Sequence, residues 1–372
     1  MRTIFECWLR ASLPGLLVTA LLSAPAIHAE SAHSINLRSV GYPSPPCDFP
    51  SLESDLFGTR SLEFLDSGHL LAKFPVRKGD VCRSAGFPWP IDFRSVVMDI
   101  SGKIVSSENW SRPQVTDVTA GPDGKILELV PSGIRLLDDS FHPTQRISLP
   151  GKDFPASRPP SPWSIQLSPS RHGFAAVYPE FIGRGFSGFS IYFAGPQLVH
   201  EVVSLNTDWA IVGDGVMVPA NGQRGFVAET RSVKIDDVSY TCASGYWIAI
   251  PQPDRPICLT SEYHLVALTA GRGQRLIADV HNLAPGLWRS GFRYLATDKD
   301  AHRILLDSFG VRFPVTDSWG FGSYRKVAVY DLSSGQQVFR IDLPFNSYVA
   351  ISPDGRHLAV QRKSKIRIYD LR

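Results

Sequence analysis

A sequence pattern of short apolar runs separated by tight turns recurs along this chain and limits the folds that it can adopt. Near the C-terminus, Ser347 to Asp354 alternates apolar and polar residues, as a half-buried strand does. Pro353-Asp354-Gly355 then supplies the residues of a tight turn, with glycine at the position that needs a positive φ. Residues 357–361 (HLAVQ) and 365–371 (KIRIYDL) follow as two further apolar runs. This stretch therefore predicts three antiparallel strands.

The same phrases stand further upstream. Residues 326–332 (KVAVYDL) match residues 365–371, and residues 146–150 (RISLP) match residues 340–344 (RIDLP). The repeating unit is strand–turn–strand–loop–strand–turn–strand, about 40 to 50 residues long, which is typical of four-stranded propeller blades. One such sheet cannot bury both of its faces alone, so neighbouring sheets must stack around an axis.

The chain resembles the WD40-like and YVTN-type β-propellers, most clearly in residues 351–371 (ISPDGRHLAVQRKSKIRIYDL). The resemblance covers residues 60–150, 160–205 and 290–372 well, and is weak over residues 206–285, where we place two units. It implies a fold and no particular function, because very different propellers share these phrases. We predict an all-β chain whose residues 30–372 form a single β-propeller of six or seven four-stranded blades, with seven favoured.

The last unit of the repeat has only three strands before Arg372. Residues 34–40 (SINLRSV) have the pattern of a short strand. We predict that this N-terminal strand completes the last blade as its outer strand and so closes the ring. Closure would remove the open sheet edges that promote aggregation.

The first 29 residues have the pattern of a secretory signal peptide. Arg2 and Arg10 provide the positive charge, residues 13–22 (LPGLLVTALL) are apolar, and small residues allow cleavage after Ala26 or Ala29. The apolar run is shorter than the roughly 20 residues of a transmembrane helix. We therefore predict a secreted or periplasmic protein without a transmembrane span after cleavage; an uncleaved anchor is the alternative.

Four cysteines remain once Cys7 is removed with the signal. An even number in an exported chain favours disulfides. Of the three possible pairings, the local one joins Cys47 to Cys82 and Cys242 to Cys258 and closes the shorter loops. Free buried thiols or a metal site are the alternatives. The sequence has no Cys-x-x-Cys motif and no close-set group of His and Cys, so we predict no metal site there.

Long insertions separate the second and third strands of three units, at residues 75–94, 178–189 and 307–325. Strand alternation places all three on one face of the predicted disc. They are rich in aromatic residues, arginine and glycine, and loops on a rigid scaffold are common binding sites. The alternative is that these aromatics fold back over the core. The candidate binding residues are Phe87, Trp89, Phe181, Arg184, Phe186, Phe313, Trp319, Phe321 and Tyr324.

These features predict a monomeric binding scaffold for a protein, peptide or glycan, without a cofactor. The formal net charge of +3 gives no indication of a nucleic-acid partner. The alternative is a propeller hydrolase or lactonase with acidic residues at the central channel, where calcium is the metal such a site would hold. No nucleophile elbow, phosphate loop or EF-hand loop is present, so catalytic residues stay unassigned. The candidate channel acids are Glu63, Asp117, Glu180, Asp208, Glu262 and Asp298.

Overall fold

The structure is a computed structural model of the chain. It describes residues 31–42, 61–76, 92–111, 117–130, 133–147, 164–167, 171, 173–182, 185–194, 198–204, 209–212, 216–219, 232–235, 238–242, 245–249, 256–283, 289–298, 302–312, 322–344 and 347–371.

The described chain is built of antiparallel sheets in which each strand lies beside the next one in sequence, except β1, which pairs with β28. One sheet contains β2 (Ser61–Phe64), β3 (His69–Pro75), β4 (Phe93–Asp99) and β5 (Ile104–Trp110). The next contains β6 (Asp117–Ala120), β7 (Ile126–Val130), β8 (Gly133–Leu137) and β9 (Pro143–Ile147). A third contains β10 (Ser164–Leu167), β11 (Phe174–Ile182), β12 (Gly185–Ala194) and β13 (Leu198–Ser204).

Two strand pairs and three further four-stranded sheets follow. The pairs are β14 (Trp209–Val212) with β15 (Val216–Pro219), and β16 (Ser232–Ile235) with β17 (Val238–Thr241). The next sheet contains β18 (Gly245–Ala249), β19 (Ile257–Thr260), β20 (His264–Leu268) and β21 (Gln274–Asp279). It is followed by the sheet of β22 (Arg289–Thr297), β23 (Arg303–Arg312), β24 (Gly322–Asp331) and β25 (Gln337–Leu343). The last sheet contains β26 (Ser347–Ile351), β27 (His357–Arg362), β28 (Lys365–Asp370) and β1 (Ser31–Asn36).

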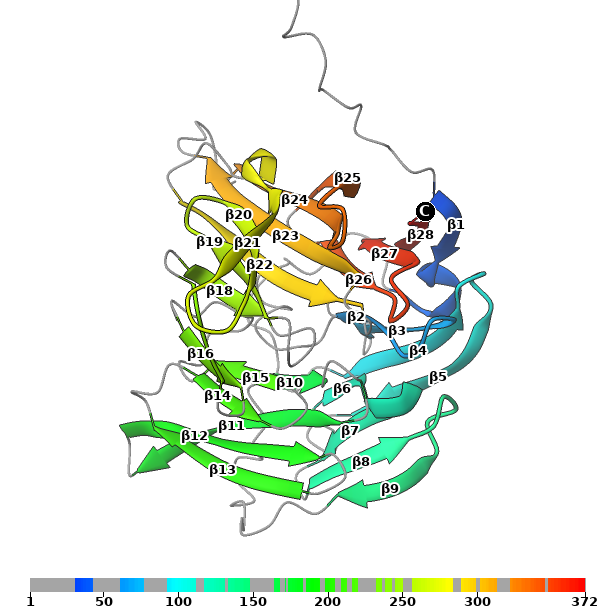
Figure 1. Cartoon of the computed structure of the whole chain (residues 1–372). Helices are drawn as coiled ribbons and strands as arrows, with labels where there is room; N and C mark the ends of the chain where they lie inside the picture. The colour runs from blue at the N-terminus through cyan, green and yellow to red at the C-terminus, as the bar shows by residue number, and fades with distance from the viewer. Residues whose placement is uncertain are drawn as a thin grey trace, which may run out of the picture.

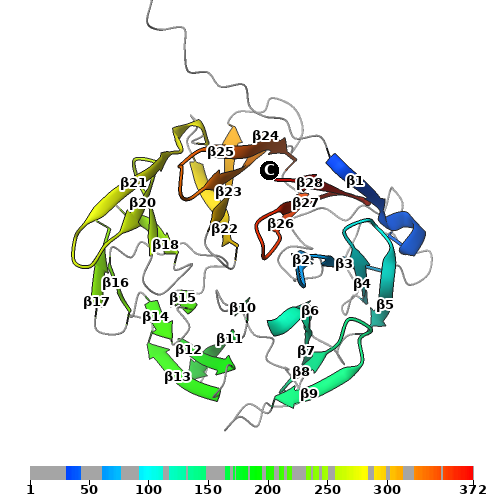
Figure 2. The same ribbon diagram turned by 45° about the vertical axis from the view of Figure 1, so that its right-hand side comes forward.

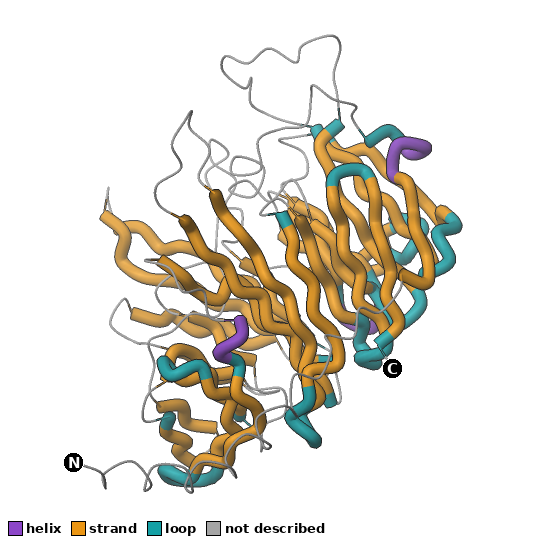
Figure 3. The backbone as a smooth tube through the Cα atoms, turned by 90° about the horizontal axis from the view of Figure 1, so that it is seen from above, coloured by secondary structure: helices purple, strands orange, loops and turns teal. Residues whose placement is uncertain are grey.

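The sheets follow one another around the molecule in chain order (Figure 1). Figure 2 looks down the middle of this arrangement, where β2, β6, β10 and β26 lie nearest the centre and β5, β9, β13 and β1 lie at the rim. Strands dominate the described chain (Figure 3), and its helical segments are the short 3-10 turns η1 (Leu37–Val40), η2 (Pro122–Gly124) and η4 (His281–Leu283). The architecture is the all-β, four-stranded one that the repeat predicts.

Burial falls from the middle strands of a sheet to the rim. In β3 the six residues after His69 are all buried, and in β27 residues 358–361 are buried in succession. Residues 143–146 of the rim strand β9 are exposed. Consecutive burial means that both faces of the middle strands are covered, because a neighbouring sheet packs on each side. A rim strand lies outside this packing and faces water.

Apolar layers fill the spaces between neighbouring sheets. One layer packs Ile366 and Ile368 of β28 against Leu62 and Phe74 of the β2–β5 sheet. Similar layers join the β2–β5, β6–β9 and β10–β13 sheets in turn, and join the β18–β21, β22–β25 and β26–β28 sheets in turn. Burying apolar surface stabilises the fold by about 25 cal/mol per Å². Because the core is divided between sheets, no sheet is stable without its neighbours.

The N-terminal strand lies beside the last sheet, as the sequence predicts. β1 pairs antiparallel with β28, with Ile35 opposite Ile366, and is the outermost strand of that sheet. The prediction of a strand over residues 34–40 is wrong at its end, because residues after Asn36 form η1 instead. The side chain of Asn36 accepts a hydrogen bond from the backbone N–H of Arg38 at 3.1 Å, which starts the turn as a helix cap does.

Two predicted insertions turn out to be mostly strand. Residues 178–189 are predicted as a loop, but β11 continues to Ile182 and β12 begins at Gly185, so that residues 183–184 separate the two strands. In the region of residues 307–325, β23 and β24 are each 10 residues long and leave residues 313–321 between them. Both segments are rich in aromatic residues, which favour strands, and backbone pairing extends the sheets through them. The first insertion, residues 75–94, lies largely outside the described residues.

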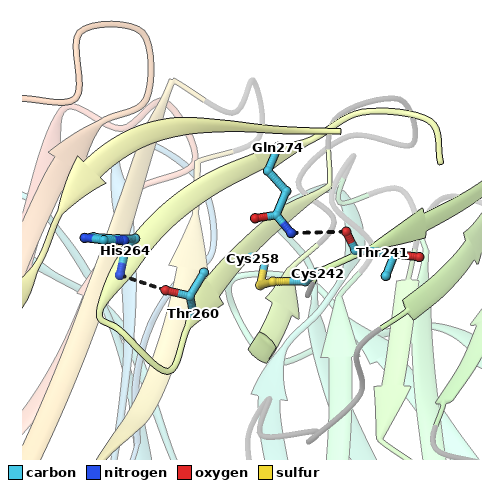
Figure 4. The surroundings of a disulfide bond; sticks show 6 residues. All are labelled: Thr241, Cys242, Cys258, Thr260, His264 and Gln274. Atoms are coloured by element: carbon cyan, nitrogen blue, oxygen red, sulfur yellow. Dashed lines mark hydrogen bonds between the residues drawn. A yellow bond between two sulfur atoms is a disulfide. The ribbon is translucent and has the colours of Figure 1, made fainter. Parts of the chain in front are cut away.

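The region of the weakest repeat, residues 206–285, contains one complete four-stranded sheet and the two strand pairs. Cys242, which follows β17, forms a disulfide with Cys258 of β19, with Cα atoms 6.4 Å apart (Figure 4). The bond therefore cross-links one strand pair to the next sheet. This is one of the two bonds of the predicted local pairing; the other two cysteines, Cys47 and Cys82, lie outside the described residues.

An aspartate closes the turn between the third and fourth strands in several sheets. Asp138 Oδ1 accepts the backbone N–H of His142 at 2.8 Å, and Asp331 Oδ1 accepts that of Ser334 at 2.8 Å. Asp99 does the same in the β4–β5 turn. The His142 N–H lowers the pKa of Asp138 below its ordinary value of 3.8, since the bond favours the charged carboxylate. For Asp331, partial burial raises the pKa, but the hydrogen bonds from its turn together outweigh it and the net pKa is lowered.

The depressed pKa of Asp138 gives a pH dependence with a definite sign. Its stabilisation is present above the unfolded pKa and is lost as the pH falls through the lower folded value. We expect Asp138→Asn to be less stable than the wild type at about pH 7 and the difference to shrink towards about pH 3. Urea unfolding of both proteins at the two pH values measures this. Asp139→Asn, on the exposed side of the same turn, is the control, and an Asp138→Asn difference that does not change with pH would contradict the prediction.

Candidate functional site

Connections between strands emerge on two opposite faces because neighbouring strands run in opposite directions. We call the face with the first-to-second and third-to-fourth strand turns the turn face; these include residues 65–68, 121–125 and 352–356. We call the other face the connection face. It carries the second-to-third strand connections and the segments that lead from one sheet to the next.

Two long hairpins reach the connection face. In the β11–β12 hairpin, Phe181 lies opposite Phe186, and in the β23–β24 hairpin Tyr324 lies opposite Gly310. Strand pairing therefore holds the backbone of these three candidate residues in fixed register. The other candidate binding residues lie outside the described residues: Phe87, Trp89, Arg184, Phe313, Trp319 and Phe321.

A buried ion pair clamps the β23–β24 hairpin. Asp307 is 0% exposed and Arg325 is 3% exposed. The Arg325 Nε donates to Asp307 Oδ1 at 2.6 Å, and a second guanidinium nitrogen donates to Oδ2. A third donates to the backbone carbonyl of Ser347, at the start of the next sheet. Buried charges need such partners, so this pair fixes the hairpin to its own sheet and to the neighbouring one.

Two candidate channel acids hold adjacent sheets together. Glu63 Oε2 in β2 accepts hydrogen bonds from the Thr119 hydroxyl and from the Ala120 backbone N–H of β6, both at 2.6 Å. Asp117 of β6 forms an ion pair with Lys73 of β3, whose side chain is almost fully buried. Both carboxylates are therefore engaged in contacts between the β2–β5 and β6–β9 sheets.

The remaining candidate acids are dispersed. Asp298 is 1% exposed and accepts the backbone N–H of His302 at 2.8 Å on the turn face. Glu262 is exposed in the turn between β19 and β20, Glu180 belongs to β11, and Asp208 lies outside the described residues. Within the described ranges, these acids form no group of three with metal-binding spacing. The hydrolase alternative stays a prediction from the sequence.

A cluster of two histidines and an aspartate, which no sequence motif indicates, lies at the rim of the β18–β21 sheet. His264 at the start of β20 stands opposite Asp279 at the end of β21. His281 follows two residues later, at the start of η4. One ligand atom from each of the three residues lies within 4.8 Å of the others. In the sequence, this cluster corresponds to an Asp-x-His spacing at the end of one strand, and the aspartate pairs with a histidine on the neighbouring strand.

Hydrogen bonds orient this cluster. Asp279 Oδ1 accepts the backbone N–H of His281 at 2.9 Å and lies 2.7 Å from its ring Nδ1. The hydrogen bond from the His281 backbone N–H lowers the pKa of the Asp279 carboxyl, and the contact with the His281 ring lowers it further. The rings of His264 and His281 lie edge to face with centroids 5.6 Å apart, and Glu262 Oε2 is 3.8 Å from His264 Nδ1. Two imidazoles and two carboxylates therefore meet at one place on the connection face.

The described part of the chain contains no helix with the length and apolar character needed to cross a membrane.

No protein-family model matches the chain, and no curated protein matches it. Similar solved structures include a chain from "Crystal Structure of Mitotic Checkpoint Complex", 12% identical, covering 96% of this chain and 99% of that one, with a TM-score of 0.47. A member of the DUF4221 family from Bacteroides vulgatus is 10% identical, covers 92% of this chain and 97% of its own, and has a TM-score of 0.44. The computationally designed Ika8 protein is 10% identical, covers 84% and 96%, and has a TM-score of 0.41.

Similarities at this level assign no function. The evidence for the fold is the arrangement of the sheets in this chain. Four-stranded antiparallel sheets follow one another around a centre, with β2, β6, β10 and β26 as inner strands, and apolar layers separate neighbouring sheets. The described residues have an all-β, propeller-like architecture of four-stranded sheets.

Proposed function

We propose that the protein is an exported interaction scaffold that binds a protein, peptide or glycan through its connection face. The observation that carries this proposal is the difference between the two faces. The described turns of the turn face, such as residues 65–68, 121–125 and 352–356, are short and hydrogen-bonded, whereas the connection face receives the extended β11–β12 and β23–β24 hairpins. Rigid strands that carry variable connections are the usual framework for a binding surface.

The composition of these connections favours recognition of a ligand. Residues 313–321 between β23 and β24 contain Phe313, Trp319 and Phe321, and residues 77–91 between β3 and β4 contain Phe87 and Trp89. Aromatic side chains dominate the binding energy of many interfaces because they bury a large area at a low cost in entropy. The Asp307–Arg325 pair at the base of one hairpin would keep such residues in place when a ligand binds.

Export is part of the same proposal. The pattern of the first 29 residues supports it, and so does the Cys242–Cys258 bond, because disulfides persist in oxidising compartments. Cleavage after Ala29 would leave β1 intact, since that strand begins at Ser31. We further propose seven blades. In that arrangement the β14–β15 and β16–β17 pairs share one blade, and β1 closes the ring.

A site-specific photo-crosslinker tests the binding face. We expect benzoylphenylalanine in place of Phe186, on the β11–β12 hairpin, to capture a discrete adduct in extracts of the source cell envelope and culture fluid. The matched control carries the same group in place of Ser334, an exposed residue of a turn-face turn. Adducts formed equally from both positions, or only from Ser334, would show that the connection face is not the binding surface.

A further inference from the structure

We propose that His264, Asp279 and His281 form a binding site for a divalent transition metal of the zinc class. The site lies at the rim of the connection face, on the β18–β21 sheet. Imidazole nitrogen and carboxylate oxygen are ligands that Zn²⁺ accepts readily. The inference is independent of the proposed scaffold function, because it rests on the three side chains alone.

The spacing of the cluster fits such an ion. Tetrahedral Zn²⁺ with nitrogen and oxygen ligands at about 2.0–2.2 Å places the ligand atoms about 3.4 Å apart. The three ligand atoms here lie within 4.8 Å of one another, so small rotations of the side chains would bring them to that distance. These rotations are open to them because the side chains of His264, Asp279 and His281 are 35%, 62% and 55% exposed.

The backbone beneath the cluster is held in place. The N–H of Val280 donates to the carbonyl of Tyr263 at 2.9 Å, which ties the end of β21 to the start of β20. Val280, just before the η4 turn, and Leu283, its last residue, are both fully buried. The N–H of His264 donates to the Thr260 hydroxyl at 3.1 Å (Figure 4). A metal would therefore have to order only side chains, which lowers the entropic cost of binding.

Two other Asp–His contacts show what distinguishes this cluster. Asp66 lies 2.9 Å from His69, and Asp138 lies 3.6 Å from His142. Within the described residues, neither pair belongs to a group of three possible ligands with this spacing. These two pairs close turns. They therefore serve as internal controls for the cluster of His264, Asp279 and His281.

Three protein ligands leave at least one coordination position for water or for a donor from a bound molecule. The neighbouring Glu262 carboxylate, 3.8 Å from His264, adds negative charge that favours a cation. The site thus differs from the predicted calcium site at the channel in its position, its nitrogen ligands and its metal.

Metal titration of the full mature chain, produced without a polyhistidine tag and stripped with chelator, tests the site. We expect one equivalent of Co²⁺ to produce the ligand-field absorption of nitrogen coordination, and one equivalent of Zn²⁺ to displace it. His264→Ala and His281→Ala should each weaken Zn²⁺ binding at least about tenfold, the loss seen even for residues that only support ligands. His142→Ala is the matched control and should bind as the wild type does.

The outcomes can be told apart because the three side chains lie outside the buried core, so that their replacement leaves the core intact. Near-UV circular dichroism checks that each variant keeps the native fold. Absence of stoichiometric Zn²⁺ uptake would overturn the proposal, and so would uptake that is unchanged in the double variant His264→Ala/His281→Ala. Equal losses in His142→Ala and His281→Ala would indicate non-specific binding to surface histidines and would also overturn it.

Discussion

Replacing Arg325 by methionine is expected to lower the free energy of unfolding by about 3–5 kcal/mol. The substitution would leave the Asp307 carboxyl in a site with 0% exposure and would remove the partner of both of its oxygens. The carbonyl of Ser347 would lose its guanidinium donor at the same time. Urea denaturation at neutral pH measures the loss.

The double variant Asp307→Leu/Arg325→Met separates the charge effect from the packing effect. Removing both charges leaves no buried ion, so this variant should regain most of the lost stability. Arg367→Met, at an exposed position of β28, is the control for loss of an arginine and should change stability little. If the single variant Arg325→Met were as stable as Arg367→Met, the ion pair would not hold the hairpin as the structure indicates.

Deleting residues 1–42 is expected to abolish cooperative unfolding and to cause aggregation. The deletion removes β1 and η1, and with them the buried side chains Ile35, Leu37 and Tyr42. It exposes the edge of β28 and the apolar residues that pack against β1, and such an edge promotes aggregation. The single substitution Leu37→Ala is a milder form of the same test and should cost about 2–5 kcal/mol.

Deletion of residues 1–30 is the matched control, because it leaves β1 complete from Ser31. Its thermal melt should be cooperative, and size-exclusion chromatography should show no aggregate. A chain lacking residues 1–42 that melts like this control would contradict the role of β1 as the completing strand of the last sheet.

Local sequence patterns account for much of the fold. The runs at residues 357–361 and 365–371 are β27 and β28 to within one residue at their ends. The turn glycines do what the pattern predicts: Gly355 adopts a φ of 71°, a value that a side chain disfavours. Alternation and turn chemistry act between near neighbours in the chain, so a single sequence displays them.

The strand limits show where local patterns stop being sufficient. Residues 178–189 and 307–325 look like loops because they are rich in glycine and interrupt the repeat. The structure pairs much of both as strand, since each backbone gains a partner from the hairpin it forms. In the opposite direction, the predicted strand at residues 34–40 ends early because Asn36 caps a turn.

The all-β class, the four-stranded unit, the tight turns and the N-terminal strand of the last sheet all follow from local patterns in the sequence. No local pattern shows that Arg325 contacts Asp307 and Ser347, that Glu63 and Asp117 join two sheets, or that two histidines lie beside Asp279; these contacts arise in the folded chain. The physical reason is the range of the interactions. Periodicity and turns depend on residues a few positions apart, whereas the meeting of distant side chains depends on strand register and sheet packing, which many weak contacts set together.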